Sequence, residues 1–399
     1  MLRQTKTRLV IGMFVTLSLM SFFMAFRGEN EQKTSGGKVA SQDESVGKEA
    51  SKAGVLRFVA MGDMLAHDSI VAQAKTGDSY DFTPYFKYIR PTYKDADVVF
   101  CNPETVSVAP ELGRSGYPTF NAPKEFADGL VKGAGCNLIN LATNHMYDKH
   151  QEGVNANVEL WGKQSVLAFA GANRSAEEQR RVRYFTKNGL KVAFVAFADY
   201  SNDPSVTPYG VNMYKDKALF TAQLQEARAK ADAVILSMHW GTEDSNQVNP
   251  DQEQAAQLAA DLGADVIIGT GPHVLQKVTW LNGKNGRKTL VWYSIGNMLS
   301  SQLKPEELTG VIASFTVQKA KNNLRVSDIR ALPTYMSYSW PVPDKAAEKL
   351  EARTDFKLRP LAQAGSTPTD MFGSSYSVNE RTQYVVNVLG NTTGIQVVK

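Results

Sequence analysis

The sequence predicts an α/β fold with a mainly parallel or mixed β-sheet, and two observations carry that prediction. Short runs of Val, Ile, Leu and Phe recur from residue 55 onward, and they are continuous rather than alternating, as in strands that are covered on both faces. Longer segments with helical apolar spacing separate several of these runs, and strand–helix alternation is typical of α/β domains. With 399 residues, 43% of them hydrophobic, the chain is long enough to build a large core.

Eight apolar runs are predicted as strands. They are residues 55–61, 97–101, 136–142, 166–170, 191–198, 233–238, 265–269 and 289–294. A helix is predicted between the sixth and seventh strands, because Asn249 suits an N-cap, Pro250 suits a first helical position and Gly263 suits a helix exit. After residue 338 the pattern weakens. There "DKAAEKLEARTDF" predicts a helix, and "TQYVVNVL" and "GIQVV" predict two late strands.

The N-terminal 53 residues differ in composition from the rest of the chain. Residues 9–26 form an uncharged, mostly apolar run, near the lower length limit for crossing a bilayer. Three cations precede the run and only Arg27 follows it before acidic residues begin, so residues 1–8 are expected in the cytoplasm and the bulk of the chain outside. We expect an uncleaved transmembrane signal-anchor, with a cleaved signal peptide as the alternative. Residues 27–53 lack large apolar side chains and predict a flexible linker.

Charge and cysteine content narrow the range of partners. The formal charge is +4, and residues 1–27 carry +4 by themselves, so the folded part is close to neutral. The basic pI of 8.8 therefore gives no support for a nucleic-acid surface, and we expect no nucleic-acid partner. Cys101 and Cys136 lie in apolar runs without ligand-like spacing. A disulfide is chemically allowed outside the cell, but buried cysteines are often simple hydrophobes, and we predict two free thiols.

Nearly every predicted strand ends in a side chain able to bind a ligand. Asp199 and Asn297 follow two of these strands. The candidate site residues follow five others and are, in chain order, Asp63, Glu104, Asn144, His145, Asp148, His239, Glu243 and His273. In an open α/β sheet, ligands bind beyond the carboxyl ends of the strands, and a mixed set of carboxylate, amide and imidazole donors suits Mn, Fe, Zn or Mg. Taken singly, each residue could merely cap a turn or a helix. Their common placement favours a shared site.

Six short motifs resemble those of a known family. They are "GD" at 62–63, "NPET" at 102–105, "NLATNHMYD" at 140–148, "HWGTE" at 239–243, "GPHVLQ" at 271–276 and "YSIGN" at 293–297. Together they resemble the CapA/PgsA-type poly-γ-glutamate capsule synthesis proteins. The resemblance implies a CapA-like extracellular domain over 54–337, with 338–399 as a C-terminal extension packing on it. It further implies a metallophosphoesterase-like mixed β-sandwich flanked by helices.

The resemblance also implies roles for the strand-end residues. The implied metal ligands are Asp63, Glu104, Asn144, His239 and His273, and the implied catalytic residues are His145 as general acid, with Asp148 and Glu243. A two-metal site needs about six or more protein ligands. Thr270 stands where the family has an imidazole, and no histidine follows Asp63 at the usual Asp-x-His spacing. A single divalent metal, a weak site and no metal at all therefore remain open.

Three functions are compatible with these features. The first is a membrane-anchored, extracellular accessory component of capsule or poly-γ-glutamate biosynthesis or export. Its expected partners are the membrane subunits of a polymer synthase, an anionic polymer such as poly-γ-glutamate, and the membrane itself through residues 9–26. The second is a metal-dependent hydrolase, a phosphoesterase or amidase, acting on a cell-envelope substrate. The third is a non-catalytic pseudoenzyme that keeps the pocket and only binds.

Overall fold

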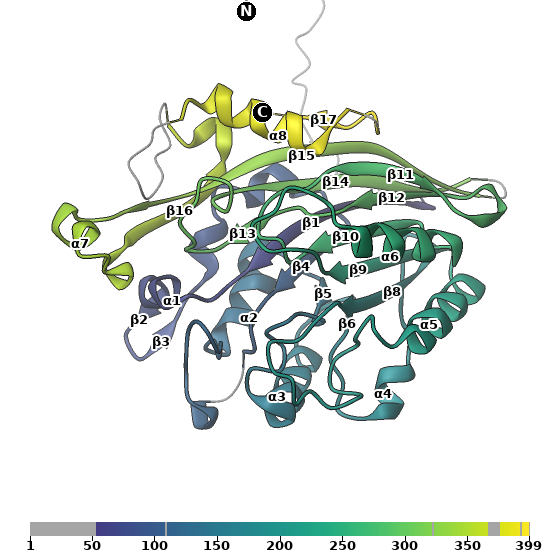
Figure 1. Ribbon diagram of the computed structural model, residues 1–399, viewed down its shortest axis with the longest axis horizontal. Helices are drawn as coiled ribbons and strands as arrows, with labels where there is room; N and C mark the ends of the chain where they lie inside the picture. Colours follow the sequence, from purple (N-terminus) through teal and green to yellow (C-terminus); the bar gives the residue numbers. More distant parts are fainter. Residues whose placement is uncertain (1–52, 108–109, 321–322, 366–375, 392, 399) are drawn as a thin grey trace, which may run out of the picture. The chain divides into compact units, whose positions relative to one another are not determined.

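Two mixed β-sheets form the centre of the folded unit (Figure 1). The computed structural model describes residues 53–107, 110–320, 323–365, 376–391 and 393–398, all within the unit Ala50–Lys399. The larger sheet has the order β16-β15-β14-β1-β4-β5-β6, with β13 beside β1 and β17 beside β15. Its strands are β1 (Val55–Met64), β4 (Val98–Pro103), β5 (Leu138–Asn140), β6 (Ala168–Ala170), β13 (Asn297–Leu299), β14 (Thr309–Lys319), β15 (Leu324–Ser339), β16 (Thr354–Pro360) and β17 (Gln396–Val397).

The smaller sheet has the order β11-β12-β10-β9-β8-β7. Its strands are β7 (Arg183–Lys187), β8 (Leu190–Ala198), β9 (Ala233–His239), β10 (Val266–Thr270), β11 (Val278–Asn282) and β12 (Lys288–Trp292). The four inner strands run parallel, and the two edge strands are antiparallel to their neighbours. The predicted α/β class with a mixed sheet is confirmed. A two-residue pair, β2 (Lys75–Thr76) with β3 (Ser79–Tyr80), forms a small third sheet.

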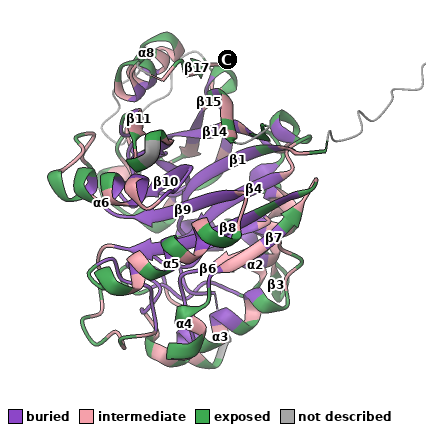
Figure 2. Ribbon diagram, turned by 90° about the vertical axis from the view of Figure 1, so that its right-hand side faces the viewer, coloured by how far each residue is buried: buried purple, intermediate pink, exposed green. Residues whose placement is uncertain are grey.

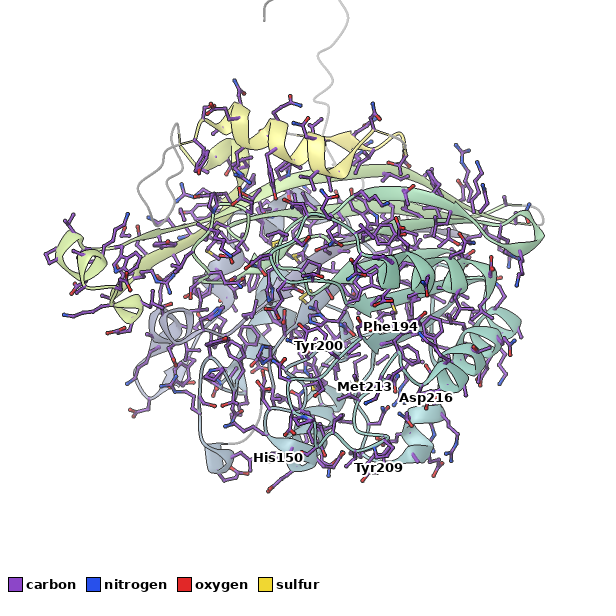
Figure 3. The ribbon with its side chains drawn as sticks, in the orientation of Figure 1. His150, Phe194, Tyr200, Tyr209, Met213 and Asp216 are labelled. Atoms are coloured by element: carbon purple, nitrogen blue, oxygen red, sulfur yellow. A yellow bond between two sulfur atoms is a disulfide. The ribbon has the colours of Figure 1, made fainter. Side chains whose placement is uncertain are left out.

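The main core lies between the two sheets, and helices cover the outer face of the smaller one. Successive residues of β8 point to opposite faces, so Phe194 (Figure 3) meets Phe100 of the larger sheet, with ring centroids 6.2 Å apart. Phe197, three residues later on the same strand, faces the other way. It packs on Phe220 of α5 (Lys217–Lys230), with ring centroids 5.0 Å apart. Figure 2 shows the central strands almost wholly buried and the helices exposed on their outer sides.

The helix predicted between β9 and β10 is confirmed as α6 (Pro250–Asp261). Asn249 and Gln252 form a reciprocal capping box at its start, and Gly263 follows its end at a φ of +95°. The remaining helices are α1 (Asp68–Ala74), α2 (Glu125–Gly129), α3 (His150–Gly162), α4 (Ala176–Arg180), α7 (Val342–Ala346) and α8 (Val378–Leu389).

All eight predicted strands are present, with boundaries shifted by a few residues. The long hairpin of β14 and β15 was not predicted. On β15 the polar residues Arg325, Asp328 and Arg330 interrupt the apolar pattern, because this strand is only partly covered. β16 and β17, both within the predicted C-terminal extension, pair with β15 and so join the larger sheet.

Two predictions for the C-terminal segment were wrong. "TQYVVNVL" belongs to α8, not to a strand, because a Ser377–Glu380 capping box opens the helix. Its buried residues Arg381, Val385 and Leu389 then recur every four positions, the helical spacing. "DKAAEKLEARTDF" is not one helix: α7 ends at Ala346, Glu348 adopts a φ of +52°, and the segment finishes in β16. The strand predicted at "GIQVV" is confirmed as β17.

The prediction of two free thiols was also wrong, because Cys101 and Cys136 form a disulfide. Cys101 lies on β4, and Cys136 lies just before β5, the adjacent parallel strand. Pairing of these strands brings the two Cα atoms to 5.8 Å, within the range that a disulfide requires. Thirty-five positions separate the two residues in sequence, so spacing alone did not reveal the bond.

The predicted tail (1–8), anchor (9–26) and linker (27–53) lie outside the described residues, except for Ala53. Among the helices of the described ranges, none combines the length and the apolarity needed to cross a membrane.

Candidate metal centre

Strand ends from both sheets bring a cluster of buried polar side chains together. Asp63 lies near the carboxyl end of β1 and Glu104 directly follows β4, its neighbour in the larger sheet. His239 ends β9 of the smaller sheet. All three side chains are fully buried, and each offers one ligand atom, such that the three atoms lie within 4.8 Å of one another. Two carboxylates and one imidazole at this separation form a donor set that can hold one divalent cation.

Asp63 reaches this position because the backbone of β1 is distorted beside it. The register with β4 shifts between Met61 and Asp63, and β1 turns to pair in parallel with β13. Gly62 permits this close approach, since a Cβ at this position would lie only 1.7 Å from the carbonyl oxygen of Gly296. The "GD" motif therefore has a steric basis as well as a chemical one.

Glu104 provides the test of whether these residues fit a metal ion. Its two carboxylate oxygens are buried and receive no hydrogen bond. Oε1 lies 3.5 Å from His239 Nε2, and Oε2 lies 3.8 Å from His273 Nδ1. A fully buried carboxylate without hydrogen-bond donors is costly unless a cation compensates it. The donor set and this carboxylate without hydrogen-bond donors both fit a divalent ion.

Asn144 and Thr270 hold the two ring nitrogens of His239. Asn144 Oδ1 lies 2.9 Å from Nε2, and Thr270 Oγ1 lies 3.0 Å from Nδ1. Asn144, an implied ligand, thus reaches the centre through its contact with His239. The hydroxyl of Thr270, which stands in place of the expected imidazole, orients the ring of His239 and adds no imidazole nitrogen to the cluster.

His273 contacts the centre as a partner of Asp63. Its Nδ1 lies 3.2 Å from Asp63 Oδ2 and 3.2 Å from Asn297 Oδ1. Both oxygens are acceptors here, so Nδ1 carries the hydrogen and donates. His273 adopts a φ of +62°, a conformation that non-glycine residues hold at a cost and that is enriched at functional sites.

The charges of Asp63 and His273 reinforce each other. Burial acts to raise the pKa of Asp63, but the hydrogen bond and charge of His273, aided by His239 and the Gly271 amide, outweigh it and lower that pKa. For His273, burial acts to lower the pKa, but the negative charges of Glu104 and Asp63 raise it to about 10. The pair is therefore ionised at neutral pH when no metal is bound.

Sequence reasoning gave no role to Asn102, which the structure places in this centre. Its Nδ2 donates to Asp63 Oδ1 at 2.7 Å, and its Oδ1 accepts from Asn140 Nδ2 at 2.6 Å. All three side chains are buried. Asn102 therefore fixes the orientation of the Asp63 carboxylate. The sequence signal that could have revealed this role was the position of Asn102 at a strand end, two residues before Glu104.

His145 and Asp148 form a dyad beside the cluster. Asp148 Oδ2 lies 2.7 Å from His145 Nδ1 and also accepts a hydrogen bond from the backbone N–H of Phe120 at 2.6 Å. Phe120 packs edge-on against the imidazole, with centroids 4.8 Å apart. A carboxylate on Nδ1 orients the ring and leaves Nε2 for proton transfer. Asn202 Nδ2 lies 3.2 Å from that Nε2.

Glu243 lies outside the three-ligand group. Its Oε1 accepts a hydrogen bond from the Tyr200 hydroxyl at 2.7 Å, and Asn144 Nδ2 donates to the same hydroxyl at 3.3 Å. Figure 3 labels Tyr200. Burial, followed by the hydrogen bond to Glu243, raises the pKa of Tyr200, so the hydroxyl keeps its proton. Glu243 is thus linked through Tyr200 to Asn144, and it makes no hydrogen bond to Asp63, Glu104 or His239.

His145, Glu243 and His273 all line one cleft of about 770 Å³, a volume within the usual range for small-molecule sites. All eight residues predicted from strand ends therefore lie in this cleft or in the buried network behind it.

A comparison with protein families identifies the chain. The family model described as "Bacterial capsule synthesis protein PGA_cap" matches residues 57–302. The chain belongs to this family. The PGA_cap match spans every strand-end residue described above, from Asp63 to His273.

Two curated relatives are similar to this PGA_cap chain. The "PGA biosynthesis protein CapA" of Bacillus subtilis (strain 168) is 29% identical over 242 residues, which cover 58% of this chain and 59% of that protein. The "Capsule biosynthesis protein CapA" of Bacillus anthracis is 29% identical over 228 residues, 54% of each chain. The chain thus matches somewhat more than half the length of these relatives.

Two solved structures are distantly similar. They are a 5′-nucleotidase from Candida albicans SC5314 (TM-score 0.40, 13% identity, 68% of this chain and 51% of that one) and the calcineurin-like phosphoesterase YfkN from Bacillus subtilis (TM-score 0.40, 13% identity, 70% and 90%).

Proposed function

We propose that the protein acts in capsule or poly-γ-glutamate biosynthesis, and that its cleft is a metal-dependent hydrolytic centre. The PGA_cap match and the names of the two CapA relatives support the process. The buried Glu104 carboxylate without hydrogen bonds, beside Asp63 and His239, carries the assignment of the chemistry. We propose that the substrate is a phosphoester or amide of the cell envelope, as the predicted metallophosphoesterase-like fold implies.

The residues of the chain have distinct tasks in this proposal. Asp63, Glu104 and His239 hold a divalent ion, for which Mn, Fe, Zn and Mg are the candidates. When bound, such an ion polarises the scissile group and makes a bound water acidic at neutral pH. His145 donates a proton to the leaving group, and Asp148 keeps its ring oriented. Asn102 and His273 hold the Asp63 carboxylate in place.

We place the folded unit outside the membrane, anchored through residues 9–26. The Cys101–Cys136 disulfide supports this location, since disulfides persist in oxidising compartments and are rare in the cytosol. Membrane subunits of a polymer synthase and the growing anionic polymer are the partners that this location makes accessible.

A non-catalytic accessory role is the second candidate, and one observation favours it. Both ring nitrogens of His239 already have partners, Thr270 and Asn144. A metal ion must displace one of these contacts to bind the ring. If it cannot, the cleft only binds and guides a substrate, as in a pseudoenzyme.

Complementation of a deletion strain distinguishes the two roles. Strains carry the wild-type chain, Glu104→Gln or His145→Gln, and the amount and chain length of the secreted anionic polymer are measured, with membrane levels of each protein as control. The hydrolytic proposal expects both variants to behave like the deletion or to change the chain length. Wild-type polymer from both variants contradicts hydrolysis and favours the accessory role. Wild-type polymer from the deletion strain contradicts any role in its synthesis.

A further inference from the structure

The C-terminal segment, beyond the part that the family model matches, contributes to the cleft. The match ends at residue 302, yet Leu350 and Arg353 line the same cleft as His145 and His273. Leu350 begins the 3-10 helix η6 (Leu350–Ala352), and Arg353 follows it directly before β16. Strand pairing of β16 with β15 therefore fixes where the side chain of Arg353 enters the cleft wall.

Arg353 is buried in neutral surroundings. The residue as a whole is only 5% exposed to solvent. Nε donates to the carbonyl oxygen of Leu350 at 2.9 Å, Nη1 donates to the carbonyl oxygen of Ser301, and Nη2 donates to Ser301 Oγ at 3.4 Å. The rings that surround the guanidinium at 5.2–5.8 Å are those of Tyr338, Trp340 and Phe356.

No carboxylate of the described residues forms an ion pair with Arg353, and this distinguishes it from Lys304, a lysine that lines the same cleft. Lys304 is neutralised by Asp244 and by Glu307, whose Oε1 lies 3.5 Å away. A buried guanidinium keeps its charge at any accessible pH. Leaving such a charge without an anion is costly, although aromatic faces offset part of the cost.

We propose that Arg353 is the receptor for an oxyanion of the substrate, a carboxylate or a phosphate. This deepens the proposed function, because it assigns an anionic substrate class to the same cleft. The guanidinium suits both groups, since its planar fork matches their paired oxygens. Leu350 and Tyr117, which are 43% and 74% exposed, line the same cleft and add apolar surface for the carbon chain that bears the anion. Substrate recognition thus depends on a segment outside the family match.

The test measures ligand binding by the purified full chain and three variants. Glu104→Gln removes the metal centre, Arg353→Gln removes the guanidinium, and Arg381→Gln is the matched control. Arg381 is equally buried and lies 3.8 Å from the ring of Tyr384, but it pairs with Glu306 and does not line the cleft. The probes are a γ-linked glutamate pentamer, the same pentamer with its α-carboxyls amidated, and inorganic phosphate.

The proposal expects Arg353→Gln to weaken binding of the charged pentamer at least tenfold, whereas Arg381→Gln binds it like the wild type. Glu104→Gln retains Arg353 and should still bind the charged pentamer more tightly than the amidated one. The amidated pentamer should bind the wild type and Arg353→Gln alike. Phosphate that displaces the bound pentamer from the wild type at a lower concentration than free charged pentamer does identifies phosphate as the preferred oxyanion. Equal binding of the charged pentamer by the wild type and Arg353→Gln, or no oxyanion binding by the wild type, overturns the proposal.

Two further measurements keep the result interpretable. If Arg353→Gln does not fold, Arg353→Lys retains the charge without the fork, and a loss of at least threefold in pentamer affinity is expected. A loss in neither variant overturns the proposal. Glu104→Gln lacks the metal centre and is also tested for pentamer binding. The binding result therefore does not depend on hydrolysis. Absence of turnover in every form defeats the hydrolytic proposal and leaves the Arg353 result intact.

Discussion

Glu104 Oε1 lies 3.5 Å from His239 Nε2, and neither oxygen of this buried carboxylate receives a hydrogen bond. The two residues come from different sheets, so the contact joins the larger sheet to the smaller one at the candidate metal centre. A divalent ion bound between them would receive ligands from both sheets.

Removal of one Glu104 oxygen should abolish metal binding. For the wild type, Mn²⁺ or Zn²⁺ at a hundred times its Kd is expected to stabilise the fold by about 2.7 kcal/mol, seen as a rise in Tm that a chelator reverses. Glu104→Gln should show no rise. Glu177→Gln, an exposed glutamate whose side chain pairs with Arg181, serves as the control and should respond like the wild type. An equal rise in Glu104→Gln contradicts the assignment.

His145 should affect turnover without affecting the metal. It contacts Asp148 and not the three-ligand group, so His145→Gln is expected to lower hydrolysis of a phosphodiester or amide substrate by about 10²–10⁴-fold. Metal content, measured by elemental analysis, should equal that of the wild type. Asp148→Asn should also lower the rate, because it removes the carboxylate that orients the His145 ring. Loss of metal in His145→Gln argues for a ligand role instead.

The disulfide should contribute to stability. Replacement of Cys101 and Cys136 by alanine is expected to lower the free energy of unfolding by about 2–4 kcal/mol, measured by denaturant titration of oxidised wild type and variant. The wild type in reductant should approach the variant. Thiol titration of the denatured, unreduced chain checks the bond directly, since these are the only two cysteines of the sequence. Detection of two free thiols contradicts it.

His67 should make the folded state sensitive to acid. The backbone N–H of Ser301 donates to its Nδ1 at 3.3 Å, which requires an unprotonated nitrogen. Burial, with added repulsion from nearby positive charges, lowers its pKa to about 3 from the usual 6.5. Below pH 6.5 the unfolded chain therefore binds a proton that the folded chain does not. Stability is complete above pH 6.5 and falls as the pH drops toward 3.

The size of this effect is measurable in metal-free protein. Between pH 6.5 and pH 5 the wild type should lose up to about 2 kcal/mol through His67, and less where cleft water reaches the half-buried ring. His67→Gln, which keeps an acceptor but does not titrate, should lose correspondingly less in urea titrations. His150→Gln, at an imidazole with 75% side-chain exposure, should follow the wild type. Identical pH profiles for wild type and His67→Gln disprove the prediction.

Gly62 should not tolerate a side chain. A Cβ at Gly62 meets the carbonyl oxygen of Gly296 at 1.7 Å, so Gly62→Ala must push β1 and β13 apart. We expect a loss of about 3 kcal/mol in stability, together with weaker metal binding because Asp63 is displaced. Gly162→Ala, where a Cβ meets nothing within 4 Å, is the control and should be neutral or slightly stabilising. Equal stability of the two variants contradicts the steric argument.

Local sequence patterns were sufficient to predict the α/β class, the eight strands of the motif-bearing region and the residues that end them. These features are local, because apolar runs and strand-end polar residues leave a pattern in neighbouring positions. The six motifs likewise indicated the family that the comparison then showed.

Which distant residues contact each other depends on the three-dimensional fold. The Cys101–Cys136 bond depends on the pairing of β4 and β5, and the support of Asp63 by Asn102 depends on the register of β1 and β4. Arg353 enters the cleft because β16 pairs with β15, far from the matched motifs in sequence. Such contacts leave no local pattern, since they arise from strand pairing and sheet packing across the whole chain.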